Sequence, residues 1–254
     1  SMSFPESKTT LVMGPSGSGK STLLKVAAGL IPPDRGSVRI LGKDPQKGWE
    51  KDIIEMRRRC GFLFQDGALW QNLSVYQNIA LPIEFHHPEL DSQEVRQRVE
   101  ASLKKFSMEH LLPYRPARLS GGEKKLVAFA RSLILHPLVL FLDEPTASVD
   151  ARSRAVVHET IRELKARERT IVAVTHDADL ASMVADYFLV IKNGRILEFD
   201  ETSQVIRSTN PEVAEILSDV LSETATYDGD ILNLLEPGAG TEPDTGEFPE
   251  DLFK

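Results

Sequence analysis

Short runs of apolar residues, bounded by glycine or polar residues, recur along the chain and predict β-strands. Most of these runs have no polar face, which is typical of strands buried on both sides, as in parallel sheets. Near the C-terminal end, two such runs flank Asn193-Gly194, the dipeptide that favours a tight β-hairpin turn. The predicted strands are residues 10–13, 36–42, 60–65, 138–142, 170–174, 188–191 and 196–199.

Apolar positions with a helical period lie between these strands and predict helices. The predicted helices are residues 23–30, 50–59, 74–81, 92–106, 119–135, 151–167, 178–185 and, as short helices, 205–221. Pro82 is expected to end the helix that begins near Ser74, because proline lacks the amide hydrogen that a helix interior requires. The alternation predicts an α/β fold, and the continuous helical pattern over about residues 72–135 predicts an α-helical subdomain inserted into it.

A glycine-rich segment joins the first predicted strand to the first predicted helix. It reads Gly14-Pro15-Ser16-Gly17-Ser18-Gly19-Lys20-Ser21-Thr22 and fits the phosphate-loop pattern G-x-x-x-x-G-K-[S/T]. Strand, loop and helix in this order direct backbone N–H groups at a phosphate chain, and glycine permits the close approach. Lys20 is then expected to bridge the β- and γ-phosphates of ATP, and the Ser21 hydroxyl to ligate Mg²⁺. The alternative is a glycine-rich turn that matches by coincidence, so the rest of the chain decides.

Composition and charge exclude several classes of protein. With 254 residues, 41% of them hydrophobic and 27% charged, the chain can bury a full core. Its one cysteine, Cys60, allows no internal disulfide and no cysteine-based zinc site. We expect no signal peptide, because the N-terminus lacks a charged start followed by an apolar core. We also expect no membrane insertion, because Arg131 and His136-Pro137 interrupt the longest apolar stretch, residues 126–142.

The net charge of −8 is confined to the last part of the chain. Nine acidic residues and one basic residue lie between Ser222 and Lys254, so residues 1–221 carry no net charge. We therefore expect an ATPase domain over residues 1–221 and an acidic tail over 222–254 that is disordered in part. No basic stripe marks the chain as a partner of nucleic acid.

Five further features follow the phosphate loop in a fixed order. They are Gln65 at a strand end, Leu119-Ser120-Gly121-Gly122-Glu123 at a helix start, Asp143-Glu144 after a buried strand, Ala147-Ser148-Val149-Asp150, and His176 after the next strand. Together with the loop they resemble the ATP-binding cassette (ABC) ATPase family over about residues 4–200. The resemblance implies a P-loop NTPase (RecA-like) core with an inserted helical subdomain and an antiparallel β-subdomain.

Two carboxylates at the end of a buried strand are expected to act on bound ATP and Mg²⁺. Asp143 lies where α/β sheets bind ligands and should hold Mg²⁺ through water, although a lone Asp can also cap a turn. Glu144 follows it and can orient and deprotonate the attacking water, as the general base does in this family; a solvated surface carboxylate is the alternative.

The family resemblance also gives roles to Gln65, His176 and Asp150. Gln65 resembles the Q-loop glutamine, which touches Mg²⁺ and water and senses the transmembrane partner. His176 resembles the switch histidine that reaches the γ-phosphate, and Asp150 resembles the D-loop aspartate that couples two sites. The resemblance thus assigns catalysis to Lys20, Gln65, Glu144 and His176, and the metal to Ser21, Gln65 and Asp143.

The segment Leu119–Glu123 resembles the signature sequence of the family. Unpaired N–H groups at the start of a helix form an anion site, and Ser120, Gly121 and Gly122 would supply it. In the family this site faces the γ-phosphate bound to a second copy, so that two ATP molecules lie in a head-to-tail dimer. Glu123 stands where the family usually has Gln. As an isolated pentapeptide, the segment is also consistent with an N-cap and a capping-box acid.

The segment upstream of the loop is shorter than the resemblance implies. ABC domains carry two more strands there, with an aromatic side chain that stacks on adenine, whereas only Phe4 precedes the first strand. We therefore expect a truncated N-terminus, an incomplete antiparallel subdomain, and weak ATP binding, since base stacking contributes roughly 1–3 kcal/mol.

The stretch from Phe64 to Pro82 resembles the Mla-type phospholipid (organic-solvent-resistance) transporter ATPases. It reads FQDGALWQNLSVYQNIALP. This resemblance implies an ATPase subunit that works with transmembrane permease subunits on the cytoplasmic face of the inner membrane and moves phospholipid or another hydrophobic substrate. Lipoprotein-export and amino-acid-uptake cassettes remain alternatives, as do a non-transport ABC protein and a regulatory module that does not hydrolyse ATP.

Overall fold

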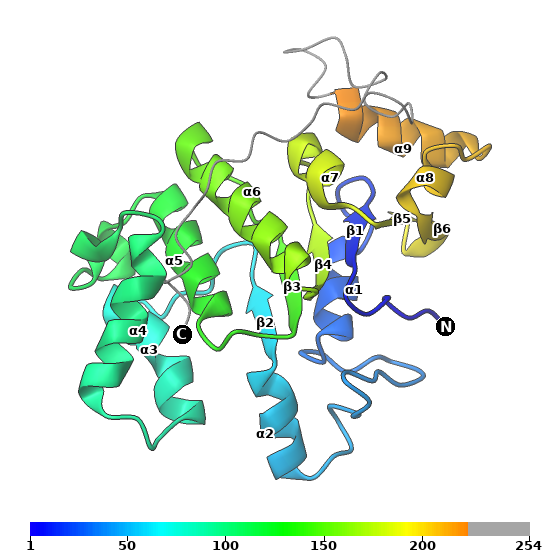
Figure 1. Cartoon of the computed structure of the whole chain (residues 1–254). Coiled ribbons are helices and arrows are strands. Elements are labelled where there is room, and N and C mark those ends of the chain that lie inside the picture. The colour runs from blue at the N-terminus through cyan, green and yellow to red at the C-terminus, as the bar shows by residue number, and fades with distance from the viewer. Residues whose placement is uncertain (223–254) are drawn as a thin grey trace.

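A six-stranded sheet forms the centre of the protein in the computed structural model, which describes residues 1–222 (Figure 1). The strand order is β2-β3-β4-β1-β5-β6. The neighbours from β2 to β5 are parallel, and β5 and β6 are antiparallel. The strands are β1 (Thr9–Met13), β2 (Cys60–Leu63), β3 (Val139–Asp143), β4 (Thr170–Val174), β5 (Tyr187–Lys192) and β6 (Arg195–Glu201). This mixed α/β sheet confirms the predicted fold class.

The parallel strands bring distant segments of the sequence to one edge of the sheet. Val174 of β4 pairs with Asp143, at the end of β3, on one side and with Val12 of β1 on the other side. The chain continues from β1 into Gly14, from β3 into Glu144, and from β4 through Thr175 to His176. Three of the predicted site segments therefore start from adjacent strand ends.

Helices cover both faces of the sheet because side chains alternate along each strand. Val12 packs in a cluster with Leu24 of α1 (Lys20–Ala27), on one face. Leu11 and Met13 pack in the larger cluster on the opposite face, which also contains buried residues of α6 (Ala151–Ala166) and α7 (Ala178–Val184). Figure 1 shows α1 on one side of the strands and α6 and α7 on the other.

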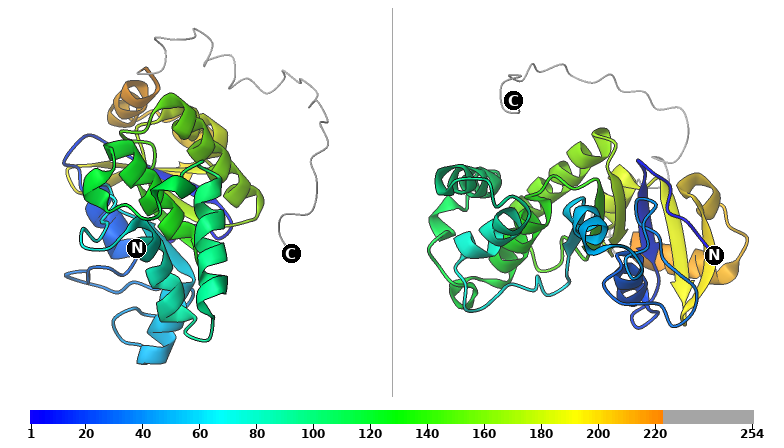
Figure 2. Two further views of the ribbon diagram at one scale, coloured as in Figure 1. Left: turned by 90° about the vertical axis from the view of Figure 1, so that its left-hand side faces the viewer. Right: turned by 90° about the horizontal axis from the view of Figure 1, so that it is seen from below.

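A lobe of helices extends from the sheet beside β2 and β3 (Figure 2). It contains α3 (Val75–His86), α4 (Ser92–Lys104) and α5 (Gly121–Leu133), with 3-10 turns at Glu109–Leu111 and Pro116–Arg118. Each of the three helices begins with a capping box, formed by Ser74 with Gln77, Asp91 with Glu94, and Ser120 with Glu123. The predicted helical segment is therefore helical, and each capping box satisfies two backbone N–H groups, those of the N-cap residue and of the third helical residue.

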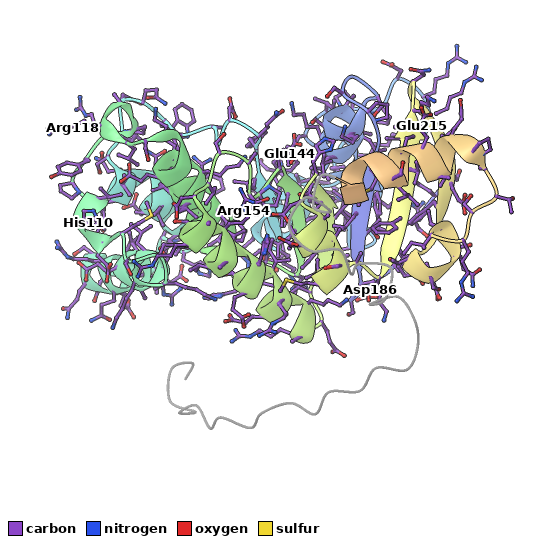
Figure 3. The ribbon with its side chains drawn as sticks, turned by 90° about the horizontal axis from the view of Figure 1, so that it is seen from above. His110, Arg118, Glu144, Arg154, Asp186 and Glu215 are labelled. Atoms are coloured by element: carbon purple, nitrogen blue, oxygen red, sulfur yellow. The ribbon has the colours of Figure 1, made fainter. Side chains whose placement is uncertain are left out.

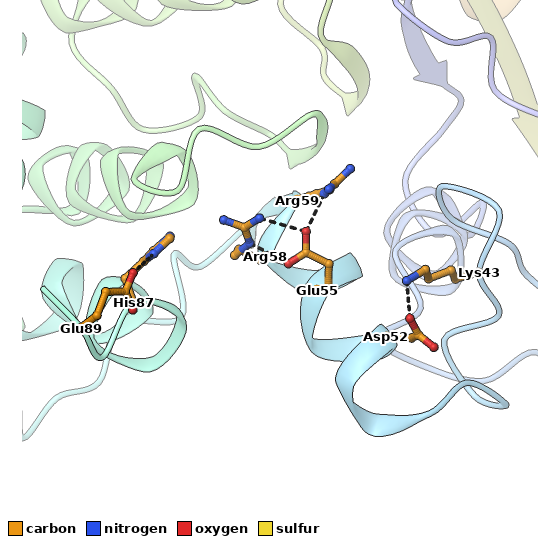
Figure 4. Close-up of polar contacts among 7 residues, drawn as sticks. All are labelled: Lys43, Asp52, Glu55, Arg58, Arg59, His87 and Glu89. Carbon is orange, nitrogen blue, oxygen red and sulfur yellow. Dashed lines mark hydrogen bonds and ion pairs between the residues drawn. The ribbon is translucent and has the colours of Figure 1, made fainter. Parts of the chain in front are cut away.

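The remaining helices lie at the periphery. They are α2 (Glu50–Arg58), α8 (Thr202–Val205) and α9 (Pro211–Ser222). On the surface of α2, the Glu55 carboxylate accepts hydrogen bonds of 2.9 Å from both Arg58 and Arg59 (Figure 4). These bonds hold the pKa of Glu55 at about 2. Lys43 lies 2.6 Å from Asp52 and so ties the preceding loop to the same helix.

Two predicted elements are wrong. Residues 36–42 form no strand and contribute only an isolated bridge between Ile40 and Lys43, because no strand in residues 1–222 lies alongside to pair with them. Pro82 does not end its helix, since α3 runs through it to His86. The continuation places Ile83, which is fully buried, in the main core, and this burial outweighs the proline's unfavourable helix propensity.

The C-terminal hairpin follows its predicted turn. Asn193 and Gly194 both have positive φ, 51° and 73°, as a tight hairpin turn requires. The acidic tail lies outside the described residues apart from Ser222. Within residues 1–222, every helix is too short or too polar to cross a lipid bilayer.

Candidate nucleotide-binding site

The phosphate loop between β1 and α1 depends on glycine at two positions. Gly14 has φ +152°, and a Cβ added to it would lie 2.0 Å from the carbonyl oxygen of Ile191. Gly19, with φ +101°, is the N-cap of α1, and no side chain caps this helix. The first N–H groups of α1 are therefore left without a capping side chain, which leaves them available to an anion.

Lys20 lies folded over the phosphate loop. Its side-chain ammonium donates hydrogen bonds to the carbonyl oxygens of Gly14, at 2.6 Å, and Pro15, at 3.0 Å. The residue is only 8% exposed, and burial lowers its pKa, while Glu144 and Asp143 oppose this shift. The ammonium is thus held at the mouth of the loop by contacts that phosphate oxygens can replace.

The Ser21 hydroxyl and the Asp143 carboxylate lie together at the start of α1 and the end of β3. Ser21 Oγ donates a hydrogen bond of 3.0 Å to Asp143 Oδ1, and Asp143 is only 1% exposed. Both groups offer oxygen, the ligand type that Mg²⁺ prefers, so the pair fits a magnesium ion shared with phosphate and water. Gln65, the third predicted ligand, lies two residues beyond the end of β2, and its backbone carbonyl accepts a hydrogen bond from Lys125.

Glu144 and His176 face each other across the ends of β3 and β4. Glu144 Oε1 lies 3.4 Å from His176 Nε2, and the Glu144 amide donates to the Val174 carbonyl at 2.9 Å. Figure 3 places Glu144 in the middle of the molecule, between the helical lobe and the C-terminal helices. Its φ of +52° is unusual for a residue with a side chain, a strain that is typical of functional sites.

The surroundings of Glu144 favour a carboxylate that can accept a proton. Its side chain is 15% exposed, whereas that of His176 is 43% exposed. Burial raises the pKa of Glu144, and the nearby His176 and Lys20 partly oppose the rise. A carboxylate with a raised pKa is a stronger base than one in water, and this suits the predicted activation of a water molecule.

The signature residues form a second group with Asp150. A pocket of about 620 Å³ is lined by Ser120, Gly121, Gly122 and Asp150, and by none of the phosphate-loop residues. Ser120 Oγ contacts the Glu123 carboxylate at 2.8 Å, and Asp150 caps α6 by accepting from the Ser153 amide. Within one chain, the N-cap and capping box considered as the alternative for Leu119–Glu123 are therefore present, and Asp150 has a capping contact that was not predicted. The structure does not bring this second group to the phosphate loop of the same chain.

A buried pair next to the predicted switch histidine was not foreseen from the sequence. His158 Nε2 of α6 lies 2.7 Å from Asp177 Oδ2, and both side chains are at most 10% exposed. Asp177 also accepts from the Leu180 amide and so caps α7. Burial alone would raise the pKa of Asp177, but the bonds from His158, Leu180 and Thr146 outweigh it and hold the pKa at about 2. The available signal was a histidine on the apolar face of α6.

Replacing Asp177 by Asn is expected to lower the free energy of unfolding at pH 7 by about 2 kcal/mol. The pKa of Asp177 in the folded state, about 2, lies below its ordinary value of 3.8. The stabilisation is therefore complete above pH 3.8 and is lost as the pH falls toward 2. Urea unfolding of both proteins between pH 7 and pH 3 should show the difference shrinking with acid. Asp179→Asn, at an exposed position of the same helix, is the control and should change little. A difference that stays constant with pH would contradict the assignment.

Replacing Gly14 by Ala is expected to destabilise the protein by about 2 kcal/mol, because the new methyl group would overlap the Ile191 carbonyl. Urea unfolding measures the effect. Gly121→Ala is the matched control, since a Cβ at that position meets nothing within 4 Å. Equal stabilities of the two variants would show that the loop can shift away from β5 at little cost.

Comparison with known proteins relates the chain to ATP-binding cassettes. A family model described as "ABC transporter" matches residues 1–147. The chain is 41% identical over 209 residues to the molybdate/tungstate import ATP-binding protein WtpC of Archaeoglobus fulgidus, covering 82% of this chain and 83% of that protein. It is 33% identical over 211 residues to the intermembrane phospholipid transport system ATP-binding protein MlaF of Haemophilus influenzae, covering 83% and 80%.

A similar solved structure is a dimer of the ATP-binding cassette MJ0796 in a post-hydrolysis state, bound to ADP and phosphate. Its TM-score is 0.73 at 30% sequence identity, and the match covers 79% of this chain and 88% of that one.

Proposed function

This chain belongs to the ABC transporter family as an ATP-binding and ATP-hydrolysing subunit, and we propose that it hydrolyses ATP at the edge of the sheet described above. The observation that carries this assignment is the meeting of Ser21 with Asp143, at 3.0 Å, and of Glu144 with His176, at 3.4 Å. The first pair suits a metal ion and the second suits the activation of water.

Each residue of the site has a task in this mechanism. The N–H groups of the phosphate loop and the Lys20 ammonium bind the phosphates, while Ser21, Asp143 and Gln65 would hold Mg²⁺. Magnesium, when bound, neutralises charge on the β- and γ-phosphates. Glu144 orients a water molecule and accepts its proton as the oxygen attacks the γ-phosphorus in line, while the bond from that phosphorus to the β–γ bridging oxygen breaks and ADP leaves. His176 contacts the γ-phosphate and keeps Glu144 in place.

The separate group formed by Ser120, Gly121, Gly122 and Asp150 supports a head-to-tail dimer. In one chain this group lines a pocket that contains no phosphate-loop residue. We infer that it receives the γ-phosphate of ATP bound to a second copy, so that each site combines two chains. The dimer of the similar MJ0796 cassette supports this arrangement.

A transmembrane permease is the partner that we propose for the surface near Gln65 and the helical lobe. Trp70 is 57% exposed there and offers a partner a large apolar contact, of the kind that is enriched in protein interfaces. The chain would bind this partner at the cytoplasmic face of the inner membrane.

Phospholipid, or another hydrophobic molecule, is the substrate that we propose, because the stretch from Phe64 to Pro82 resembles Mla-type ATPases and the chain is similar to MlaF. Import of an oxyanion is a second candidate, favoured by the 41% identity to the molybdate/tungstate import protein. The neighbouring coding sequences distinguish them. A permease next to a lipid-binding protein supports the first, and a permease next to an anion-binding receptor supports the second.

Phosphate release from ATP by the purified chain tests the proposed activity directly. Release is expected with Mg²⁺ and should fall to background when EDTA removes the metal. Equal release under both conditions, or none at millimolar Mg²⁺ and ATP, would contradict the proposal.

A further inference from the structure

Strands β2 and β3 separate just before the candidate magnesium site. Their ladder runs from Cys60 opposite Val139 to Leu63 opposite Leu142. Beyond it, Asp143 continues to pair with β4, whereas the chain after β2 leaves through Phe64 and Gln65. Gln65 and Asp143, two of the predicted metal ligands, therefore lie where the two chain segments diverge, beyond the last hydrogen-bonded pair of β2 and β3. We call this divergence the fork.

Lys125 of α5 bridges this fork. Its ammonium donates to the carbonyl oxygens of Gln65 at 2.7 Å, Phe64 at 3.3 Å and Asp143 at 3.3 Å. An ammonium has three N–H donors, so these contacts use all of them. The residue is only 4% exposed, and the contacts are therefore shielded from competing water.

We propose that Lys125 is a positioning residue that holds the backbones of Gln65 and Asp143 at the separation that Mg²⁺ needs. Mg²⁺ requires near-ideal octahedral geometry, so a small shift of one ligand weakens binding. Because Lys125 lies on α5, whose N-cap is Ser120, it also fixes the helical lobe to the metal end of the site. This inference rests on the proposed ATPase function.

The charge of Lys125 predicts the opposite effect on the metal. The ammonium lies near the acidic side chains of Asp66, Asp143 and Glu144. If it acted on the site through charge alone, it would repel Mg²⁺, and its removal would strengthen metal binding. The sign of the change therefore separates positioning from electrostatics.

Calorimetry of ATP binding with and without Mg²⁺ tests the inference on three variants. Lys125→Met removes charge and donors, Lys125→Gln keeps an amide donor, and Lys124→Met is the control on the same helix, at a less buried position. In Lys125→Met, the gain in ATP affinity on adding Mg²⁺ should fall about tenfold, as for other losses of support behind a metal ligand. Metal-free ATP binding should stay within about twofold of the unchanged chain. Lys125→Gln should be intermediate and Lys124→Met unchanged.

Three results would overturn the inference. The first is a gain in ATP affinity on adding Mg²⁺ that is the same in Lys125→Met as in the unchanged chain, and the second is a larger gain. The third is a loss of metal-free ATP affinity as large as the loss with Mg²⁺, together with a lower melting temperature, which would indicate a purely structural role. If Lys125→Met does not fold, the same readings on Lys125→Gln decide. Absence of any Mg²⁺ effect in the unchanged chain would instead overturn the proposed function, so the two failures are distinguishable.

Discussion

Replacing Glu144 by Gln is expected to lower the rate of ATP hydrolysis by about 10²–10⁴-fold, the range typical of a lost general base. Glutamine has nearly the same shape but cannot accept the proton of the attacking water. The residue lies next to Asp143 and 3.4 Å from His176, and burial raises its pKa, so no other described carboxylate combines these features. ATP affinity should change by less than about threefold, because Lys20 and the phosphate loop remain intact.

Single-turnover phosphate release and ATP-binding calorimetry measure the two quantities. Glu84→Gln, an exposed change on α3, is the matched control and should leave both unaltered. A normal hydrolysis rate in Glu144→Gln would remove the catalytic assignment. It would also reopen the alternative of a nucleotide-binding module in which Glu144 is only a surface carboxylate.

The strand ends that carry the candidate site could be predicted because their sequence signals are local. A buried strand followed by Gly14, Asp143 or His176 places each residue at a strand end, and parallel strands align those ends. The capping box of Ser120 and Glu123 could also be predicted from the sequence, because both partners lie within four residues of each other. These parts of the fold need no knowledge of how helices pack.

Other features depend on packing between distant segments and could not be predicted. Pro82 ends a helix by local rules, yet burial of Ile83 keeps α3 intact through it. The contact between His158 and Asp177 joins two helices, and Lys125 reaches backbone carbonyls 60 residues away. In each case the sequence shows which residue is present, but its contact partner is determined only by how the helices pack in the folded protein.

The two groups of site residues have different structural support. The first group makes direct polar contacts at the strand ends. These contacts are Lys20 with Gly14, Ser21 with Asp143, and Glu144 with His176. Ser120 and Asp150 instead satisfy helix N-termini and line a separate pocket. This separation within one chain is the reason for the proposed dimer, in which a second copy supplies Ser120 and Asp150.

Replacing Lys20 by Met is expected to weaken ATP binding by about 100-fold, the effect of losing charge-assisted hydrogen bonds to phosphate. In the described state the ammonium donates to the carbonyl oxygens of Gly14 and Pro15, and ATP must take over these donors. Methionine has similar length but no donor, so the phosphate chain would lose its cation and those two carbonyls would lose their partner. Calorimetry with ATP measures the change, and Lys25→Met on the same helix is the control for charge alone. If both variants bind ATP as tightly as the unchanged chain, Lys20 keeps its contacts with the loop when ATP binds, and the N–H groups of the loop suffice for the phosphates.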